Sequence, residues 1–257
     1  MKAQLFSNPH PLIGVIHLPA MPGWDGSPGL EGVITKALAE LHTLHQAGFD
    51  GALVENEGDR PHPLAVDRAY QDMFVELMTV LRGQARIPLG LEILYDMVST
   101  VRVGIECGAD FVRLDVFTDD TETRWGVVKA CVEDVQSLRR CSRERPLLFT
   151  DVHVKHGRNL TTRSLVESGR LAVACGADGL IVTGTQTGVP PTIEDCRALK
   201  AAAGGIPVYV GSGFSEANAA EILSECSGVI MASSIKRGDS IALDLASRVR
   251  TVVDGLP

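Results

Sequence analysis

The sequence predicts a single (β/α)₈ barrel that spans residues 1–257, and three observations predict it. Eight short apolar runs alternate with longer stretches of helical period, as expected for a parallel sheet covered by helices. The residue types just before these runs also form a pattern that recurs in every second unit. Finally, 257 residues divide into eight units of about 32 residues, the usual size of a strand, a helix and their loops in such a barrel.

The eight expected strands are short and apolar on both faces, which is typical of buried parallel strands. They cover residues 12–17, 51–55, 89–94, 111–115, 147–151, 179–183, 208–211 and 229–232. Between them, residues 33–47, 65–81 and 165–175 have the period of amphipathic helices.

The strand starts form a repeat of two units. The first, third, fifth and seventh strands each follow a proline, where a missing N–H breaks no ladder: Pro11, Pro88, Pro146 and Pro207. The second, fourth and sixth follow a glycine and an aspartate: Gly48 and Asp50, Gly108 and Asp110, Gly176 and Asp178. We expect each glycine to adopt the left-handed conformation that ends a helix.

The alternative fold is an open doubly wound sheet, which carries a glycine-rich phosphate fingerprint after its first strand. Residues 17–23 have the sequence HLPAMPG instead, and no linker or change of composition indicates a second domain. The chain shows no signature for NAD, pyridoxal phosphate or flavin, so the sequence identifies no organic cofactor.

Composition excludes several classes of function. With 24 basic and 32 acidic residues the net charge is −8, and no basic block is present, which disfavours nucleic-acid binding. No apolar run reaches the roughly 18 residues of a transmembrane span, and the N-terminus lacks a cleavage site. The six cysteines contain no C-x-x-C pair, which favours buried thiols. We therefore expect a cytoplasmic protein.

Polar residues at the expected strand ends predict a site at the mouth of the barrel, where packing would favour apolar groups. After strands seven and eight, glycines and serines could cup a phosphate with N–H and O–H donors. This phosphate cup is formed by Gly211, Ser212, Gly213, Ala232, Ser233 and Ser234. A second set, expected to contact the substrate, is Asn56, Arg113, Asp115, Thr183, Gly184 and Thr185, the last three in a loop that could close over a ligand.

The other strand ends are acidic. Glu55, Glu92 and Asp151 could hold a divalent metal ion, or could supply a general acid and base of shifted pKa. The alternative for Glu92 is a salt-bridge network with Arg113 and Asp115. For Asp151 we favour a catalytic role.

Two histidines and a lysine complete the candidate residues. If the fifth strand continues past Asp151, then His153 and Lys155 share its face, and His153 joins the catalytic set. His17 ends the first strand and is a candidate for proton transfer. For Lys155 we expect a solvated loop lysine rather than a Schiff-base residue, because His153, His156 and Arg158 are polar neighbours.

Eight stretches resemble the BtpA/SgcQ family. They are GVIHLPAMPG, ALVENEGDRP, LGLEIL, DFVRLDVF, DVHVKHG, GLIVTGTQTGVPP, VYVGSGF and GVIMASSIKRG, and they span almost the whole chain. The resemblance implies a TIM-type barrel. It also implies relatives associated with photosystem I accumulation in cyanobacteria, and relatives in non-photosynthetic bacteria and archaea, some beside sugar-transport genes.

Three functions follow as hypotheses. The first is an enzyme acting on a small phosphorylated metabolite as an isomerase, a lyase or an aldolase-like enzyme, since no acyl-transfer motif is present. The second is a non-catalytic assembly factor for a photosystem or another membrane protein. The third is a sensor that binds a phosphorylated ligand without turnover. The helix faces within 127–130 and 243–253 could pack against a second copy in a homo-oligomer, or against the barrel.

Overall fold

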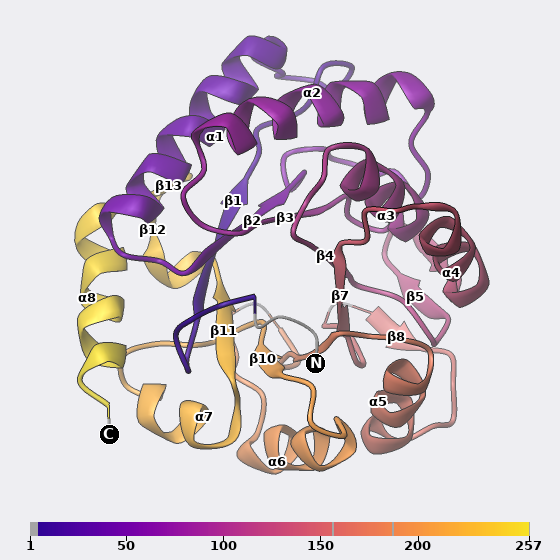
Figure 1. Cartoon of the computed structure of the whole chain (residues 1–257), viewed down its shortest axis with the longest axis vertical. Coiled ribbons are helices and arrows are strands. Elements are labelled where there is room, and N and C mark those ends of the chain that lie inside the picture. Colours follow the sequence, from indigo (N-terminus) through magenta and orange to yellow (C-terminus); the bar gives the residue numbers. More distant parts are fainter. Residues whose placement is uncertain (1–4, 156, 187, 257) are drawn as a thin grey trace.

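The computed structural model describes residues 5–155, 157–186 and 188–256. Within these residues eight parallel strands close into a barrel, and eight helices surround it (Figure 1). In order around the barrel the strands are β1 (Leu12–His17), β2 (Gly51–Glu55), β3 (Leu89–Glu92), β4 (Phe111–Leu114), β7 (Leu147–Asp151), β9 (Gly179–Val182), β10 (Val208–Val210) and β11 (Gly228–Met231), which pairs with β1. The predicted fold class is confirmed.

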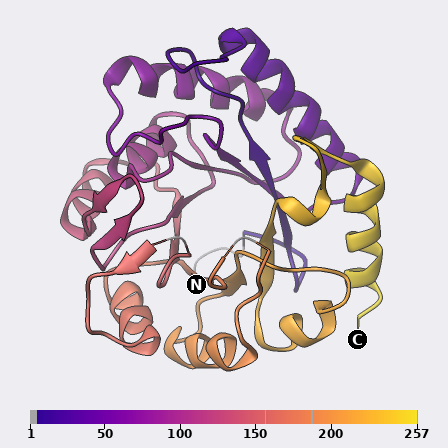
Figure 2. The same ribbon diagram turned by 180° about the vertical axis from the view of Figure 1, so that it is seen from behind.

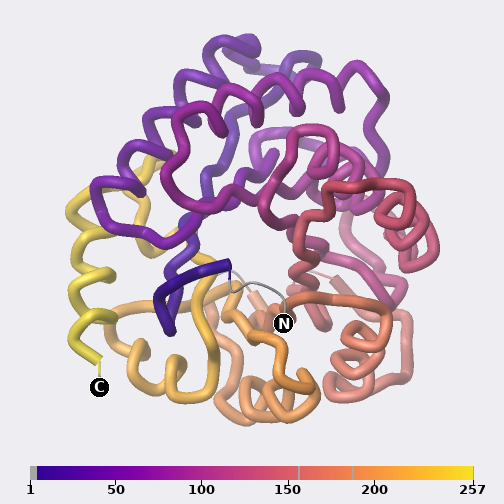
Figure 3. The backbone as a smooth tube through the Cα atoms, in the orientation of Figure 1, coloured from indigo at the N-terminus to yellow at the C-terminus, as the bar shows by residue number. Residues whose placement is uncertain are grey.

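The helices follow the strands in the expected alternation. They are α1 (Gly29–Gln46), α2 (Arg68–Gln84), α3 (Met97–Glu106), α4 (Val132–Cys141), α5 (Leu165–Ala174), α6 (Ile193–Ala202), α7 (Ala219–Glu225) and α8 (Leu243–Asp254). Figure 3 shows the ring closing where α8 lies beside α1. Within the described residues, no helix is long and apolar enough to cross a membrane.

The two-unit repeat has a structural cause. Gly48, Gly108 and Gly176 have φ of 75°, 66° and 93° and end helices, as predicted. The aspartate that follows each of these glycines accepts a hydrogen bond from a backbone N–H at the start of the preceding strand. The bonds run from Leu12 to Asp50, from Leu89 to Asp110 and from Leu148 to Asp178, at 2.9–3.0 Å. In the fourth pair of units, the Ser227 hydroxyl accepts the corresponding hydrogen bond from the Val208 N–H. These contacts, which we call strand-start clamps, fix neighbouring strands in register.

Aromatic rings fill the barrel interior. Phe111, Phe149 and Tyr209 lie in a row from three strands, with 4.9 Å between successive ring centroids. Phe6, from the segment before β1, packs edge-on against the first and last of them and covers the end where the strands begin. Gly90 leaves room for this row, because a Cβ there would lie 2.2 Å from the Phe111 ring.

Short strands at the opposite end were not predicted. β5 (Thr121–Thr123), β6 (Gly126–Val128) and β8 (Gly157–Asn159) form an antiparallel sheet in the order β6-β5-β8. Figure 2 views the barrel from the end that carries it. A 3₁₀ turn η1 (Ser233–Ile235) follows β11, and β12 (Lys236–Arg237) pairs with β13 (Ser240–Ile241). This end is also the end at which the barrel strands terminate.

Candidate functional site

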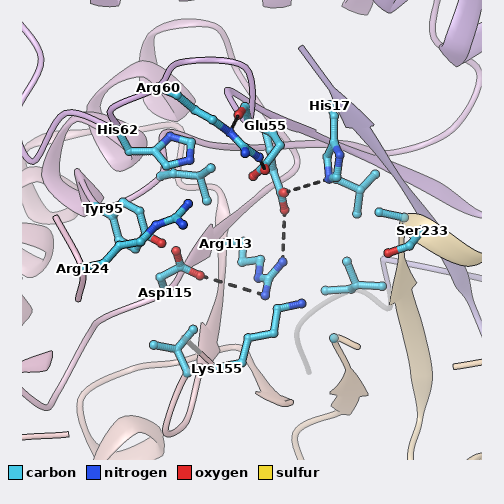
Figure 4. A pocket seen from close by; sticks show the side chains of 17 residues that line it. His17, Glu55, Arg60, His62, Tyr95, Arg113, Asp115, Arg124, Lys155 and Ser233 are labelled. Carbon is cyan, nitrogen blue, oxygen red and sulfur yellow. Dashed lines mark hydrogen bonds and ion pairs between the residues drawn. The ribbon is translucent and has the colours of Figure 1, made fainter. Parts of the chain in front are cut away.

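A cavity of about 460 Å³ opens at the carboxyl ends of the strands. His17 and Glu55 reach it from β1 and β2, and Arg113 reaches it from β4 (Figure 4). Loops contribute the rest of the polar lining, which comprises Glu57, Arg60, His62, Tyr95, Asp115, Arg124, Lys155 and Ser233. We call this cavity the mouth pocket.

Arg113 is the centre of the site. Its guanidinium binds Asp151 with two hydrogen bonds, Nε to Oδ2 at 2.8 Å and Nη2 to Oδ1 at 3.0 Å. Nη1 donates to Glu55 Oε1 at 3.1 Å. Glu92 and Asp115 lie further away, at 3.6 and 4.0 Å. One buried cation therefore faces four buried carboxyl groups, and the salt-bridge alternative for Glu92 and Asp115 describes part of this network.

The excess of acids predicts that protons are retained in the network. Burial raises the pKa of Glu92 well above its usual value, and the neighbouring Asp115 raises it further. Burial also raises the pKa of Asp115, to about 7. Asp115 and Glu92 also repel each other when both are ionised, which favours a proton on one of them. The pair therefore holds an exchangeable proton at neutral pH.

His17 adds a proton acceptor on the other side of the pocket. Its Nε2 lies 3.6 Å from Glu55 Oε2. Burial and the nearby Lys236 lower the pKa of His17 to about 4, so the imidazole is neutral at neutral pH. Of the five catalytic residues predicted from the sequence, His17 and Glu55 line the mouth pocket. Glu92 and Asp151 do not line it and contact Arg113 instead.

His153 is turned away from this site, so the prediction that it shares a face with Asp151 and Lys155 is wrong. The strand ends at Asp151, and His153 has a φ of 57°, which reverses the direction of the chain. Its Nε2 lies 3.1 Å from the hydroxyl of Ser168 on α5. Lys155 lines the pocket nevertheless, because the chain turns back after His153.

Three further side chains at the pocket edge, Arg60, His62 and Arg124, were missed by the sequence analysis. Arg60 and His62 follow β2, and Arg60 pairs with Glu57. Arg124 lies in the turn between β5 and β6, with its guanidinium 4.5 Å above the ring of Trp125. The run that contains Arg60 and His62 comes directly after a predicted strand, which was a usable signal. The turn that contains Arg124 was not predicted, so no signal existed for it.

The residues predicted to cup a phosphate line a second cavity of about 450 Å³ beside the mouth pocket. All six residues proposed for the cup line it: Gly211, Ser212, Gly213, Ala232, Ser233 and Ser234. Gly213 has a φ of 69°, and a Cβ there would lie 2.1 Å from the Pro190 nitrogen. Only glycine fits this close approach of two loops. We keep the name phosphate cup for this cavity.

The loop after β9 supports the cup rather than lining the mouth pocket. Its Gly184 N–H donates to the Ser212 hydroxyl at 2.8 Å, and that hydroxyl donates to the Val189 carbonyl at 3.2 Å. The Thr183 hydroxyl accepts the Lys155 N–H at 3.1 Å. Thr185 is exposed and lines neither cavity, and Thr187 lies outside the described residues, as does His156. The hydroxyl of Ser212 therefore makes both of these hydrogen bonds with the loop after β9.

Asn56 is a scaffold residue. It is fully buried, accepts the Leu94 N–H at 2.8 Å and donates to Asp59 Oδ2 at 3.1 Å. Asp59 in turn accepts the Met21 N–H and the Tyr70 hydroxyl. These bonds join the loops after β1, β2 and β3, so Asn56 positions the loop that carries Arg60 and does not line the mouth pocket.

The geometry does not support a metal site on Glu55, Glu92 and Asp151. The Arg113 guanidinium occupies the space among these carboxyl groups, with Asp151 using both oxygens to bind it. In the part of the chain that the structure describes, no group of three or more His, Cys, Asp or Glu side chains is arranged to hold a metal ion.

The chain belongs to the BtpA family, which residues 8–256 match. It is 34% identical to the photosystem I biogenesis protein BtpA of Synechocystis sp., over 98% of this chain and 91% of that protein. A protein of Pyrococcus horikoshii is 30% identical over 97% of this chain and 98% of its own length. The resemblance found in the sequence is confirmed.

Solved structures share the fold. A thiamine phosphate pyrophosphorylase from Pyrococcus furiosus has a TM-score of 0.60 and 15% identity, covering 96% of both chains. An N-(5′-phosphoribosyl)anthranilate isomerase from the same organism has a TM-score of 0.58 and 12% identity, covering 96% of this chain and all of that one. At these identities the likeness concerns the barrel alone.

Proposed function

We propose that this protein is an enzyme that acts on a small phosphorylated metabolite as an isomerase, a lyase or an aldolase-like enzyme. The observation that carries the proposal is the contact between the two cavities. The mouth pocket and the phosphate cup share Lys155, Gly211, Ile230, Ala232 and Ser233 in their walls. A ligand with its phosphate in the cup therefore extends directly toward the proton-handling groups.

The cup has the chemistry of an anion site. No acceptor for the backbone N–H groups of Gly213, Ser233 and Ser234 is found within the described residues. The Ser233 and Ser234 hydroxyls and the Lys155 side-chain nitrogen add further donors. Asn218 holds the turn in shape, since it donates to the Gly213 carbonyl and accepts the Ser215 N–H.

The mouth pocket has the chemistry of proton transfer. His17 is a neutral base, and Asp115 with a pKa of about 7 is an acid near its own midpoint at neutral pH. The two approach the pocket from different strand ends. Such a pair can remove a proton from one carbon or oxygen of a ligand and return it to another, as isomerases and lyases require. Solved barrels of similar fold include enzymes named for phosphorylated substrates.

Inorganic phosphate tests the cup. We expect phosphate to raise Tm relative to sodium chloride of equal ionic strength, because binding to the folded state alone stabilises it by about 2.7 kcal/mol at a hundredfold excess over Kd. Ser234→Asp places a carboxylate in the cup and should abolish the shift. Ser224→Asp adds the same charge to an exposed position on α7 and should preserve it. A shift of equal size in chloride, or one that survives Ser234→Asp, contradicts the proposal.

The assembly-factor alternative requires an apolar docking surface. Within the described residues the exposed large apolar side chains are Leu64, Val80, Val127, Leu160, Val189 and Leu243, which belong to six different loops, strands and helices. Leu64 and Val127 line one cavity, and exposed apolar residues in such small numbers are ordinary for a globular protein. This distribution supports the enzyme proposal over the alternative.

A further inference from the structure

We infer that Lys155 is the nucleophile of this site and forms an imine with a carbonyl carbon of the phosphorylated substrate. The inference rests on the proposed function, because the phosphate cup would deliver the carbonyl group to the amine. It adds a covalent step and restricts the substrates to phosphorylated aldehydes and ketones.

The position of Lys155 is the first support. Its side chain lines both the mouth pocket and the phosphate cup, at their common wall. Figure 4 shows the amine directed toward the middle of the mouth pocket, beside the Arg113 guanidinium. Two of the three polar neighbours that suggested a solvated loop have partners elsewhere, because His153 contacts Ser168 and Arg158 pairs with Glu122, and the third, His156, lies outside the described residues.

The surroundings of the amine favour its neutral, nucleophilic form. No ion pair of the Lys155 ammonium occurs within the described residues, although several acids surround Arg113 nearby. Val15, Val154 and Ile230 are apolar parts of the same pocket wall. Burial lowers the pKa of Lys155, and the charge of Arg113 lowers it further. These are the two conditions under which a lysine becomes a nucleophile near neutral pH.

The step needs a proton, and the site holds one. The neutral amine attacks the carbonyl carbon, a C–N bond forms, and the carbonyl oxygen takes up a proton. That oxygen then leaves as water after a second protonation, while the nitrogen gives up both of its protons, one before and one after water leaves, so an amine and a carbonyl give an imine and one water. The carboxyl pair Asp115 and Glu92, with raised pKa values, is the proton donor, and Asp115 lines the same pocket as Lys155. Water hydrolyses the product imine and restores the free lysine.

Pyridoxal 5′-phosphate is a suitable probe, because it is a small phosphorylated aldehyde that forms imines with accessible neutral amines. We would incubate the intact protein with it at neutral pH, reduce with borohydride and map the labelled lysines. We expect Lys155 to react faster than Lys129 and Lys200, by about tenfold for each unit by which its pKa is lowered. Inorganic phosphate should slow this labelling by occupying the cup.

Lys236 is the matched control. Its pKa is also lowered by burial, but its side chain lines neither cavity. Faster labelling of Lys155 than of Lys236 therefore reports the pocket and not the pKa alone. Lys155→Arg should lose the label at this position, because a guanidinium group forms no imine with an aldehyde under these conditions.

The outcomes separate this inference from the proposed function. Equal labelling of Lys155 by pyridoxal and by its phosphate ester, unaffected by inorganic phosphate, supports the nucleophile but contradicts the phosphate cup. Labelling confined to lysines outside the pocket, with the phosphate-dependent increase in Tm intact, overturns the nucleophile. In that result Lys155 binds phosphate only as a point charge, and the proposed function stands.

Discussion

At the scale of single residues, the charge balance around Arg113 determines the chemistry of the site. Asp151 holds the guanidinium with two short bonds, and Glu55 adds a third. The remaining carboxyl groups, Glu92 and Asp115, have little positive charge left to compensate them. A buried acid without compensation keeps its proton instead of ionising. The arginine therefore divides the four acids into two that accept its hydrogen bonds, Glu55 and Asp151, and two whose pKa values are raised, Glu92 and Asp115.

The retained proton on Asp115 predicts an unusual pH dependence for the free energy of unfolding of the protein. The unfolded chain releases this proton near its ordinary pKa of about 3.9, whereas the folded protein keeps it up to about pH 7. Between these values the unfolded state binds fewer protons, so the free energy of unfolding falls as the pH rises. Asp115→Asn removes that loss, and its stability relative to the wild type should increase by about 1 kcal/mol or more from pH 5 to pH 8.

Urea unfolding at both pH values measures this difference. Asp134→Asn, which removes an exposed carboxylate from α4, serves as the control and should follow the wild-type dependence. A relative stability of Asp115→Asn that stays constant, or decreases with pH, would show that Asp115 is ionised throughout.

The sequence predicted which residue types meet at the mouth but not the direction of each side chain. Strand ends indicated His17, Glu55 and Arg113 because regular alternation sets where a strand residue points. His153 and Lys155 lie beyond the strand, where one positive φ reverses the direction. The alternation rule put His153 and Lys155 on one face, and the polar neighbours of Lys155 suggested that it lies in solvent. In the structure His153 turns away and Lys155 lines the mouth pocket.

At the scale of elements, the strand-start clamps explain why the repeat was visible in the sequence. A clamp needs an acceptor at a fixed place, so the aspartate recurs with the glycine that ends each preceding helix. Each clamp aspartate also binds an arginine from a helix: Arg250 with Asp50, Arg82 with Asp110 and Arg139 with Asp178. By contrast, β5, β6 and β8 have three residues each. β5 and β6 form a hairpin, β8 pairs with β5 from a distant part of the chain, and strands this short show no period that a sequence could reveal.

The clamp at Asp110 gives a prediction about folding stability. Asp110→Ala leaves the buried Leu89 N–H without an acceptor and should lower the free energy of unfolding by about 1–3 kcal/mol. Asp110→Asn keeps an amide oxygen as acceptor and should recover most of this loss. Urea unfolding of both variants distinguishes the hydrogen bond from the ion pair with Arg82. Equal losses in the two variants would assign the stabilisation to the charge.

At the scale of the whole molecule, the barrel separates stability from chemistry. The aromatic row of Phe111, Phe149 and Tyr209 fills the interior, and Phe6 covers it where the strands begin. The polar cavities lie at the other end, where the strands terminate. The sequence could predict this separation, because the ends of barrel strands have fixed roles. It could not predict that Phe6 closes the barrel, since that residue precedes the first strand.

Two substitutions at opposite ends should therefore have independent effects. Phe6 is 5% exposed, and Phe6→Ala should lower the free energy of unfolding by about 3–5 kcal/mol through the cavity that it leaves. Since the phosphate cup lies beyond the aromatic row, the increase in Tm on adding phosphate should persist in this variant. Ser234→Asp should behave in the opposite way, with wild-type unfolding in buffer and no response to phosphate. In the double variant the two changes should add. If Phe6→Ala also abolishes the phosphate response, packing at one end of the barrel controls the site at the other.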